Sequence, residues 1–309
     1  MSGAAHFDGR AADYARARPP YPPALWKRVQ ETGLLEPGRR AVDLGAGTGQ
    51  ATGPLLTAGL DVVAVEPGPN LAALLQQSSP QARVVVATAE DVPLEADSFD
   101  LAVVATAVHW MDLSIVLPKV HRALREDGRL LVWRNVFGDP AAPTTPFRER
   151  VAEIVRRRPT PPRPGDAEDA PATARSLTRS GLFRVEDMSG FRWDVQLDDD
   201  QVRLLFSTFS DWSPAEVNEA AAAVRELGGS VVEHYSSWLI IAEPHRSAAA
   251  GTAMYQSGVA SIECIRGTPS ERPHGPKEEA PRDPRRASVV GVQHPFGSVG
   301  LTGFEPATP

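Results

Sequence analysis

Three glycines at alternate positions mark the stretch of the chain best suited to hold a ligand. Residues 41–44 form a short apolar run interrupted by Asp43, and Gly45, Gly47 and Gly49 follow at once. The next residues carry an amphipathic helical pattern, so the order reads strand, tight turn, helix. Glycine permits positive φ and close approach of backbone to a ligand, and N–H groups at a helix start can face that ligand. We therefore predict a ligand-binding turn; a turn that serves only the chain itself is the alternative.

A second acidic position, Glu66, fits the sugar of a nucleoside-type ligand. It ends the apolar run of residues 60–66, which is typical of a parallel strand buried on both faces. A carboxylate at that strand end can accept hydrogen bonds from both ribose hydroxyls; a surface glutamate before Pro67 is the alternative. The glycine spacing is G-x-G-x-G, followed by Gln50, and lacks the third glycine of the dinucleotide fingerprint. A ligand without a pyrophosphate needs no such cradle.

Strand and helix patterns alternate along the first half of the chain, which indicates an α/β fold with a parallel sheet and right-handed crossovers. The expected strands are residues 41–44, 60–66, 83–87, 97–105 and 129–134, and the expected helices are 24–35, 51–58, 70–77 and 115–124, the last closed by Gly128 in the left-handed conformation. Further on we expect helices at 147–158, 173–180, 199–208 and 214–227, a strand pair at 183–188 and 191–197, and a closing strand at 231–242.

The run D-x-G-x-G-x-G at a strand end resembles class I S-adenosylmethionine (SAM)-dependent methyltransferases. Residues 87–94 resemble the G-D-A-E-x-L-P loop that borders the adenine in that family, and residues 14–22 resemble the Y-x-x-x-R-P-x-Y-P lead of its small-molecule "type 11" branch. The resemblance implies a Rossmann-like, seven-stranded, mostly parallel sheet with helices on both faces and a cap insertion, with SAM as cofactor. The cofactor-binding residues that it implies are Tyr14, Arg18, Asp43, Gly45, Ala46, Gly47, Gly49, Glu66, Thr88, Ala89, Glu90, Ala105 and Thr106.

Some of these positions leave alternatives open. Thr88 stands where the family usually has an aspartate that contacts the adenine amino group, and Ala87 replaces a glycine. Tyr14 and Arg18 fit the methionine carboxylate by resemblance, since a guanidinium matches a carboxylate in bidentate geometry. The alternative is that Tyr14 packs against its neighbours and that Arg18 is exposed to solvent.

His109 is the candidate catalytic residue, because an imidazole of near-neutral pKa can take a proton. It follows the fourth expected strand, at the edge where α/β sheets place their chemistry. The branch carries A-x-H-W in members with diverse substrates, so His109 and Trp110 alternatively form a pocket wall, or simply pack. With Tyr21 they make up the expected substrate pocket.

Composition excludes several classes of partner. The formal net charge of −7 speaks against nucleic acid, because phosphate binding needs a basic face. One cysteine, Cys264, excludes an internal disulfide and a multi-cysteine zinc site. No metal is expected, since the adjacent carboxylates of residues 198–200 point in different directions. No apolar run approaches a membrane span, and no signal layout opens the chain, so no membrane is expected as a partner and a cytoplasmic location is.

Residues 1–246 are expected to form the methyltransferase domain, with a lead at 1–23 that folds over the pocket and a variable cap insertion at 136–172. Residues 247–309 show no hydrophobic period and are expected to be a disordered tail.

The expected function is transfer of a methyl group from SAM to a small-molecule acceptor by in-line displacement. Catalysis of this kind needs mainly alignment and exclusion of water. A nicotinamide-dependent oxidoreductase is one alternative, although the third glycine is missing. A SAM-binding protein without catalysis is the other.

Overall fold

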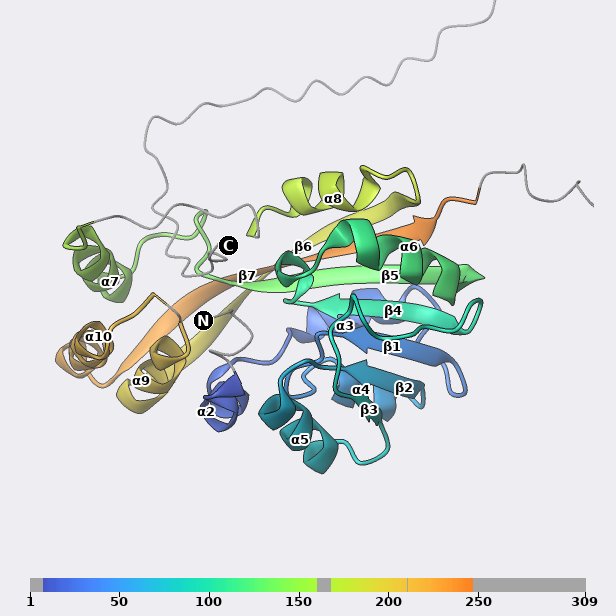
Figure 1. Cartoon of the computed structure of the whole chain (residues 1–309). Coiled ribbons are helices and arrows are strands. Elements are labelled where there is room, and N and C mark those ends of the chain that lie inside the picture. The colour runs from blue at the N-terminus through green and yellow to red at the C-terminus, as the bar shows by residue number, and fades with distance from the viewer. Residues whose placement is uncertain (1–7, 160–167, 210, 247–309) are drawn as a thin grey trace, which may run out of the picture. The chain divides into compact units, whose positions relative to one another are not determined.

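A seven-stranded sheet forms the centre of the protein in the computed structural model, which describes residues 8–159, 168–209 and 211–246 (Figure 1). Its strands are β1 (Arg40–Leu44), β2 (Asp61–Val65), β3 (Arg83–Val85), β4 (Phe99–Ala105), β5 (Leu124–Phe137), β6 (Phe183–Asp198) and β7 (Ser230–Pro244), in the spatial order β3-β2-β1-β4-β5-β7-β6. The first five strands run parallel, and β7 is antiparallel to both β5 and β6. The predicted Rossmann-like, mostly parallel sheet is thus confirmed.

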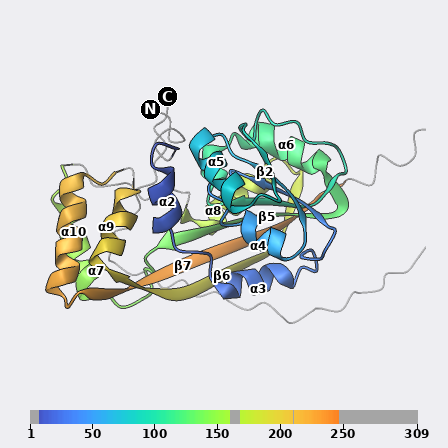
Figure 2. The same ribbon diagram turned by 90° about the horizontal axis from the view of Figure 1, so that it is seen from below.

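Helices cover both faces of this sheet. The helices among the described residues are α2 (Ala11–Ala17), α3 (Pro23–Gln30), α4 (Thr52–Thr57), α5 (Pro69–Ser78), the 3-10 turn η1 (Val108–Trp110), α6 (Leu113–Ala123), α7 (Pro146–Arg156), α8 (Ala170–Thr178), α9 (Asp199–Ser207) and α10 (Pro214–Glu226). One face packs against α6 and α8, and the other against α3 and α4; Figure 2 shows α3 and α6 on opposite sides of the sheet. Each face of the sheet has its own hydrophobic core, and alternate residues of a strand belong to different cores because successive side chains point to opposite faces.

The cap differs from the predicted insertion at 136–172. Among the described residues of that range, α7 and Phe137 pack in the cap, and the helices α9 and α10 that pack with α7 come from later in the chain. Helix α8 packs instead on the sheet through Leu177. Residues 160–167 of the predicted insertion, and the predicted tail at 247–309, lie outside the described residues. The cap, made of α7, α9 and α10, has its own hydrophobic core where β6 ends and β7 begins. This core contains Phe147, Val151, Ile154, Leu197, Val202, Leu205, Phe206, Phe209, Val217, Ala220, Ala223, Val224 and Val231.

Two local predictions were wrong. The expected strand pair at 183–188 and 191–197 is the single strand β6, because Ser189 and Gly190 continue the ladder opposite Leu239 and Trp238. Gly128 does not close a helix in the left-handed conformation. Helix α6 ends at Ala123 and the chain passes straight into β5; a β-carbon at Gly128 would lie 3.1 Å from the Phe99 carbonyl oxygen, so the glycine serves close packing instead.

The N-terminal lead ties the sheet half to the cap, with α2 between α5 and α9 (Figures 1 and 2). The Asp8 carboxylate accepts hydrogen bonds from the backbone N–H groups of Asn70 and Leu71, at 2.8 and 3.1 Å, and so caps α5 from a distant part of the sequence. At the other side, the Arg10 guanidinium donates to the Ser207 carbonyl at the end of α9. The local sequence of α5 does not predict this cap, because Asp8 is distant in the sequence.

Candidate active site

The glycine turn after β1 has left-handed backbone angles at its three glycines. Gly45, Gly47 and Gly49 have φ of +72°, +57° and +93°, values that L side chains disfavour. The N–H groups of Gly45 and Ala46 donate to the Val65 carbonyl at 2.9 and 3.0 Å, which joins the turn to the end of β2. Nothing lies within 4 Å of the position where a β-carbon of Gly47 would sit. The backbone at Gly47 is therefore open to a ligand.

Gly45→Ala should lower the free energy of unfolding by about 2 kcal/mol, because it combines a left-handed φ with a clash. Its β-carbon would lie 2.5 Å from the β-carbon of Ala107, which follows β4. Thermal unfolding followed by circular dichroism measures this effect. Gly53→Ala is the matched control, since Gly53 lies in α4 with open space around it and should gain stability instead. Equal shifts for both variants would contradict the packing described here.

The Glu66 carboxylate lies under the glycine turn and is 6% exposed. One oxygen accepts from the Gly47 N–H and the other from the Gly68 N–H, both at 2.8 Å. Burial raises the pKa of Glu66, and these two backbone donors oppose the rise. The side chain thus joins the glycine turn to the residues that follow β2, and its role toward a ribose stays a prediction.

Asp43 is fully buried at the end of β1. Its Oδ2 accepts a 2.7 Å hydrogen bond from the Thr52 hydroxyl, whereas Oδ1 has no hydrogen-bond partner among the described residues. Burial raises the pKa of Asp43 to about 7. A buried acceptor without a donor is costly, so this oxygen fits a ligand that brings an N–H or O–H group, or an ammonium, to the turn.

The end of β4 meets the N-terminal lead. Thr106 has φ of +60°, an uncommon backbone conformation for a β-branched residue. Its hydroxyl lies 2.9 Å from the Tyr21 hydroxyl, and its N–H donates to the Trp133 carbonyl at 2.8 Å. The Tyr21 ring is buried and packs edge-on against Trp26 and Trp133. The lead thereby contacts the chain just after Ala105, at the end of β4. This strand end is the one predicted to face the methyl group.

His109 stands beside a buried arginine that the sequence reasoning missed. Arg134, in β5, is 2% exposed, and its Nη1 lies 3.0 Å from Nδ1 of His109. A guanidinium is always the donor, so Nδ1 accepts and the ring proton of neutral His109 sits on Nε2. Burial, followed by the charge of Arg134, lowers the pKa of His109 to about 3. In this geometry the imidazole is a hydrogen-bond donor toward its surroundings, which favours the pocket-wall interpretation over the general base.

The His109 imidazole should therefore stay neutral down to about pH 4. A depressed pKa means that the ring gains its proton only when the pH falls through the lowered value. Two-dimensional NMR of nitrogen-15-labelled histidine follows each ring through pH, with the His109→Gln variant assigning the signal. A ring that titrates near pH 6.5 would contradict the hydrogen bond to Arg134.

Tyr14 and Arg18 lie together, and their side chains face the cap. The Arg18 guanidinium lies 5.2 Å from the Tyr14 ring centroid and 4.9 Å from that of Phe209. Its Nη2 donates to the Thr208 carbonyl at 3.4 Å, and its own carbonyl accepts from the Gln50 side chain. Arg18 is part-buried between lead and cap, so it is not the solvated side chain of the alternative interpretation.

The predicted adenine loop is organised by its own side chains. The Thr88 hydroxyl donates to the Asp91 carboxylate at 2.8 Å and accepts from the Asp91 N–H. The Glu90 carboxylate accepts from the Asp112 N–H at 2.7 Å, and Ala89 is buried. These contacts join the loop to the start of α6, and the role of the three residues toward an adenine stays a prediction.

The signal for Arg134 was present in the sequence: a single arginine directly follows the apolar run of residues 130–133. The strand expected at 129–134 ends at this arginine, for which no role was expected. Asp8 was also missed, because its contact with α5 is tertiary, and Gly68 was missed although it lies only two residues after Glu66.

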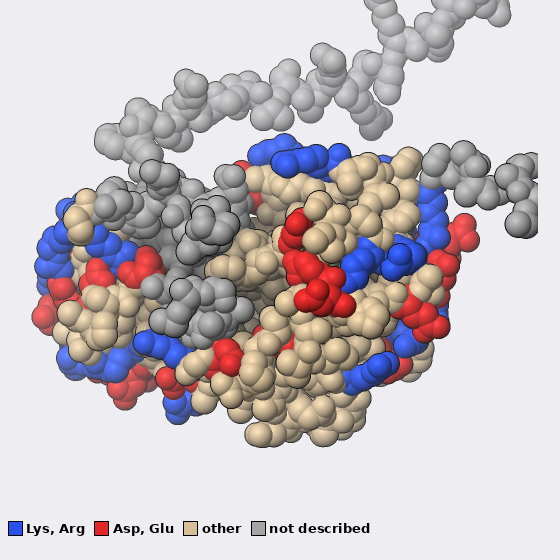
Figure 3. All heavy atoms as spheres, viewed as in Figure 1, with Lys and Arg blue, Asp and Glu red and all other residues tan. Residues whose placement is uncertain are grey.

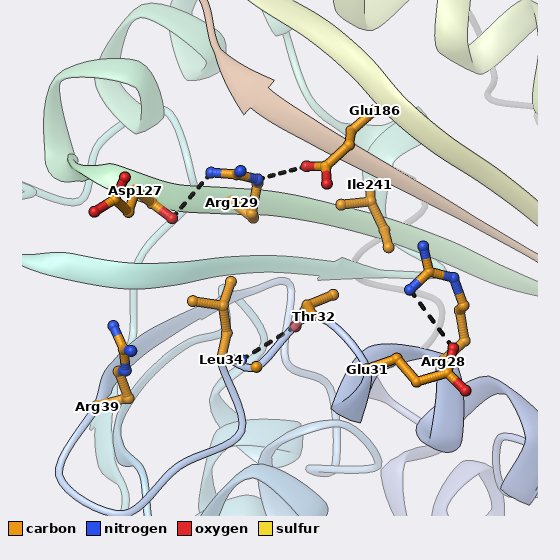
Figure 4. A pocket seen from close by; sticks show the side chains of 10 residues that line it. Arg28, Glu31, Thr32, Leu34, Arg39, Asp127, Arg129, Glu186 and Ile241 are labelled. Atoms are coloured by element: carbon orange, nitrogen blue, oxygen red, sulfur yellow. Dashed lines mark hydrogen bonds and ion pairs between the residues drawn. The ribbon is translucent and has the colours of Figure 1, made fainter.

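Two pockets lined by described residues lie away from most of the predicted site residues. A pocket of about 380 Å³ lies near the start of β5, where Arg129 and Glu186 face each other 2.6 Å apart (Figure 4). None of the predicted site residues lines it. A wider groove of about 1190 Å³ runs between α3 and α4 and reaches Tyr21 at one end. The candidate site therefore lies where the C-terminal ends of β1, β2 and β4 meet the N-terminal lead.

Comparison with known proteins finds similarity to methyltransferases. Residues 42–132 match the family Methyltransf_11, described as a methyltransferase domain. Uncharacterized methyltransferases of Mycobacterium tuberculosis and Mycobacterium bovis are 44% identical over 130 residues, which is 42% of this chain and 52% of theirs. A methyltransferase-like protein of Schizosaccharomyces pombe is 31% identical over 153 residues, 49% of this chain and 58% of its own. The chain thus spans about half the length of the curated relatives that it matches.

Among solved structures, a protein of Anaeromyxobacter dehalogenans, provisionally named a type II methyltransferase, superposes with a TM-score of 0.51. It is 23% identical and aligns over 74% of this chain and 99% of its own, which supports the fold alone. The strand order and the bent D-x-G-x-G-x-G turn agree with the family match, and residues 42–132 are therefore similar, in sequence and in fold, to class I S-adenosylmethionine-dependent methyltransferase domains of the type 11 branch.

Proposed function

We propose that the chain transfers a methyl group from SAM to a small-molecule acceptor. The observation that carries this proposal is the Glu66 carboxylate, with one oxygen on each of two backbone N–H groups, set beneath an open Gly47. The glycine turn follows β1 and Thr106 follows β4, so the two flank the point where the strand order reverses. Ligands of α/β sheets bind at that switch point, outside the carboxyl ends of the strands.

The residues present fit SAM. Glu66 would hold the ribose hydroxyls, and the buried Oδ1 of Asp43, which has no donor among the described residues, would receive a polar hydrogen of the ligand. Bound SAM supplies an electrophilic methyl group on a sulfonium. The chain's own part is to align the acceptor with that methyl group near Ala105 and Thr106, and to exclude water with the lead around Tyr21.

The remaining predicted contacts belong to the same proposal. Tyr14 and Arg18 would close the site from the lead, Thr88, Ala89 and Glu90 would border the adenine, and His109 and Trp110 would form a wall of the acceptor pocket. A small acceptor, rather than nucleic acid, is supported by the surface in Figure 3. On the face in view, Lys and Arg side chains alternate with Asp and Glu around the described residues and form no continuous basic band. No helix among the described residues is long and apolar enough to cross a membrane.

Calorimetric titration with SAM and then with NADH tests the cofactor. Binding of SAM and not NADH is expected; the reverse would replace the proposal with a nicotinamide oxidoreductase. Methyl-labelled SAM incubated with the protein and a metabolite panel tests the transfer. SAM binding with no labelled product across the panel would favour a SAM-binding protein without catalysis.

A further inference from the structure

Strand β6 lies at the margin of the sheet, so one of its two edges has no strand beside it (Figure 2). It is the last strand in the spatial order and pairs with β7 alone. Among the described residues, the backbone of residues 189–197 has no hydrogen-bond partner other than β7. A row of unpaired N–H and C=O groups along one edge is a template for pairing with another strand.

A bulge limits this edge at one end. The pairing of β6 with β7 shifts register between Val185 and Asp187, and bulges interrupt pairing and turn an edge aside. The pairing is regular from there to the end of the strand, and we call residues 187–198 the open edge. This stretch contains neither Lys nor Pro, two residues that protect the edges of monomeric proteins.

The side chains of the open edge divide between the two faces of the sheet. Phe191, Trp193 and Val195 are half-buried on one face, where Phe191 packs on the core beneath α3 and α4 and Val195 on the cap core. Arg192 and Asp194 alternate with them on the other face, and their side chains are 72% and 63% exposed. The open edge thus presents an apolar row on one face and two opposite charges, two residues apart, on the other.

Both charged groups can take a further partner. Nε of Arg192 lies 2.9 Å from the Asp139 carboxylate, and Oδ1 of Asp194 lies 2.6 Å from Nδ1 of His234. A guanidinium has five donors and a carboxylate has two acceptor oxygens. No other partner of either group is found among the described residues. The Nη groups of Arg192 and the second oxygen of Asp194 are therefore available at the surface.

The order of these residues matches a second copy of the same strand. Two identical strands pair antiparallel about a two-fold axis normal to the sheet, and residues equally far from that axis lie opposite each other. With the axis at Trp193, Arg192 of each copy faces Asp194 of the other, and Phe191 faces Val195. With the axis moved one residue either way, Arg192 faces Arg192 or Asp194 faces Asp194, which is unfavourable.

We propose that the open edge is an interface between two copies of the chain, with Trp193 of both copies on the two-fold axis. Arg192 then pairs with Asp194 of the partner subunit, and symmetry makes this ion pair twice. The two sheets join into one sheet that runs through both copies. The interface does not include the glycine turn after β1, so the proposal is independent of the proposed function.

Sedimentation velocity of the full chain over a concentration series tests the association. We expect a dimer of twice the 33.2 kDa mass of the chain, which dissociates on dilution. Arg192→Asp alone sets carboxylates against each other, and Asp194→Arg alone does the same with guanidinium groups. Each variant should raise the dimer Kd at least about thirtyfold, because the repulsion occurs twice in a symmetric interface.

A mixture of these two variants tests the register itself. When one copy carries Arg192→Asp and the other carries Asp194→Arg, every facing pair again has opposite charges. The mixture should therefore form a heterodimer, although neither variant dimerises alone. Arg184→Asp is the matched control, since Arg184 lies on the same strand before the bulge and its side chain is also 72% exposed. It should leave the dimer Kd unchanged.

Three outcomes would overturn the inference. One is a chain that stays monomeric at every concentration, as an edge reserved for an extended segment of another protein would give. Another is a dimer whose Kd is unchanged in both variants, which would place its contact on a different surface. The third is failure of the two folded variants to associate when mixed. If Arg192→Asp does not fold by circular dichroism, Asp194→Arg and Asp194→Asn replace it, and both should weaken the dimer, the first of them more.

Discussion

Glu66→Ala should weaken SAM binding more than tenfold in calorimetric titration. The substitution removes both oxygens that accept from the Gly47 and Gly68 N–H groups, which leaves those donors without their partner and loosens the glycine turn. It also removes the carboxylate proposed to hold the ribose hydroxyls. Glu66 thus combines a structural and a binding role, and both losses act on the same measured affinity.

Two further variants make this result specific. Glu66→Gln keeps one acceptor oxygen but places an NH₂ group against a backbone N–H, so its affinity should lie between those of the wild type and the alanine variant. Glu36→Ala removes an exposed glutamate whose partner is Arg39, and should leave SAM affinity unchanged. Unaltered binding in Glu66→Ala would take Glu66 out of the site and with it the central contact of the proposed function.

Arg148→Met should lower the free energy of unfolding by about 3 kcal/mol at pH 8, because it strands a carboxylate inside the cap. Glu233 in β7 is fully buried, and its carboxylate lies 2.6 Å from Nε of Arg148. The guanidinium also stacks on the Phe137 ring, 4.4 Å from its centroid, and occupies the space beside Gly138. For a domain of this size the expected fall in Tm is roughly 6–12 °C.

The destabilisation should depend on pH. Burial raises the pKa of Glu233 to about 7, and Arg148 opposes the rise. An acid whose folded pKa is raised contributes stability below its unfolded pKa, near 4.5, and loses that contribution as the pH rises through the folded value. Without Arg148 the folded pKa rises further, so the gap between variant and wild type should be small at pH 5 and grow up to pH 8.

Arg150→Met provides the matched control for this experiment. Arg150 lies on the same helix, α7, and its ion pair with Glu226 is exposed. Exposed pairs contribute little, so the change should stay below about 1 kcal/mol at either pH. A loss for Arg148→Met that does not vary between pH 5 and pH 8 would show that Glu233 is not the source of the effect.

Much of the sheet half followed from local patterns. The apolar runs of β1, β2 and β4 are long enough, and the glycines after β1 distinctive enough, to fix strand, turn and helix without tertiary information. A helix was expected from residue 199, and Asp198 caps α9 by accepting from the Gln201 N–H, while the Gln201 side chain accepts from the Asp198 N–H. Such signals succeed because the groups that interact are close in sequence.

The predictions that went wrong, or were not made at all, concern contacts between distant segments. Gly190 looks like a turn in isolation, but the pairing of β6 with β7 holds it in an extended strand. Glu233 reads as the polar face of a strand, and only the packing of α7 onto β7 reveals it as a buried charge. Arg134 likewise becomes significant only when the neighbouring strand ends beside it. Local periodicity carries no information about these partners.

The continuous β6–β7 pair has a consequence for engineering. These strands run from the α8 side of the sheet to the core shared by α7, α9 and α10, with one register shift between Val185 and Asp187. Since one ribbon supplies residues to both ends, a chimera that borrows only residues 146–156 from a relative would set foreign side chains against native Val202, Phe206 and Val224. Exchange of the cap between relatives should therefore work in units that carry the three helices together with the distal halves of both strands.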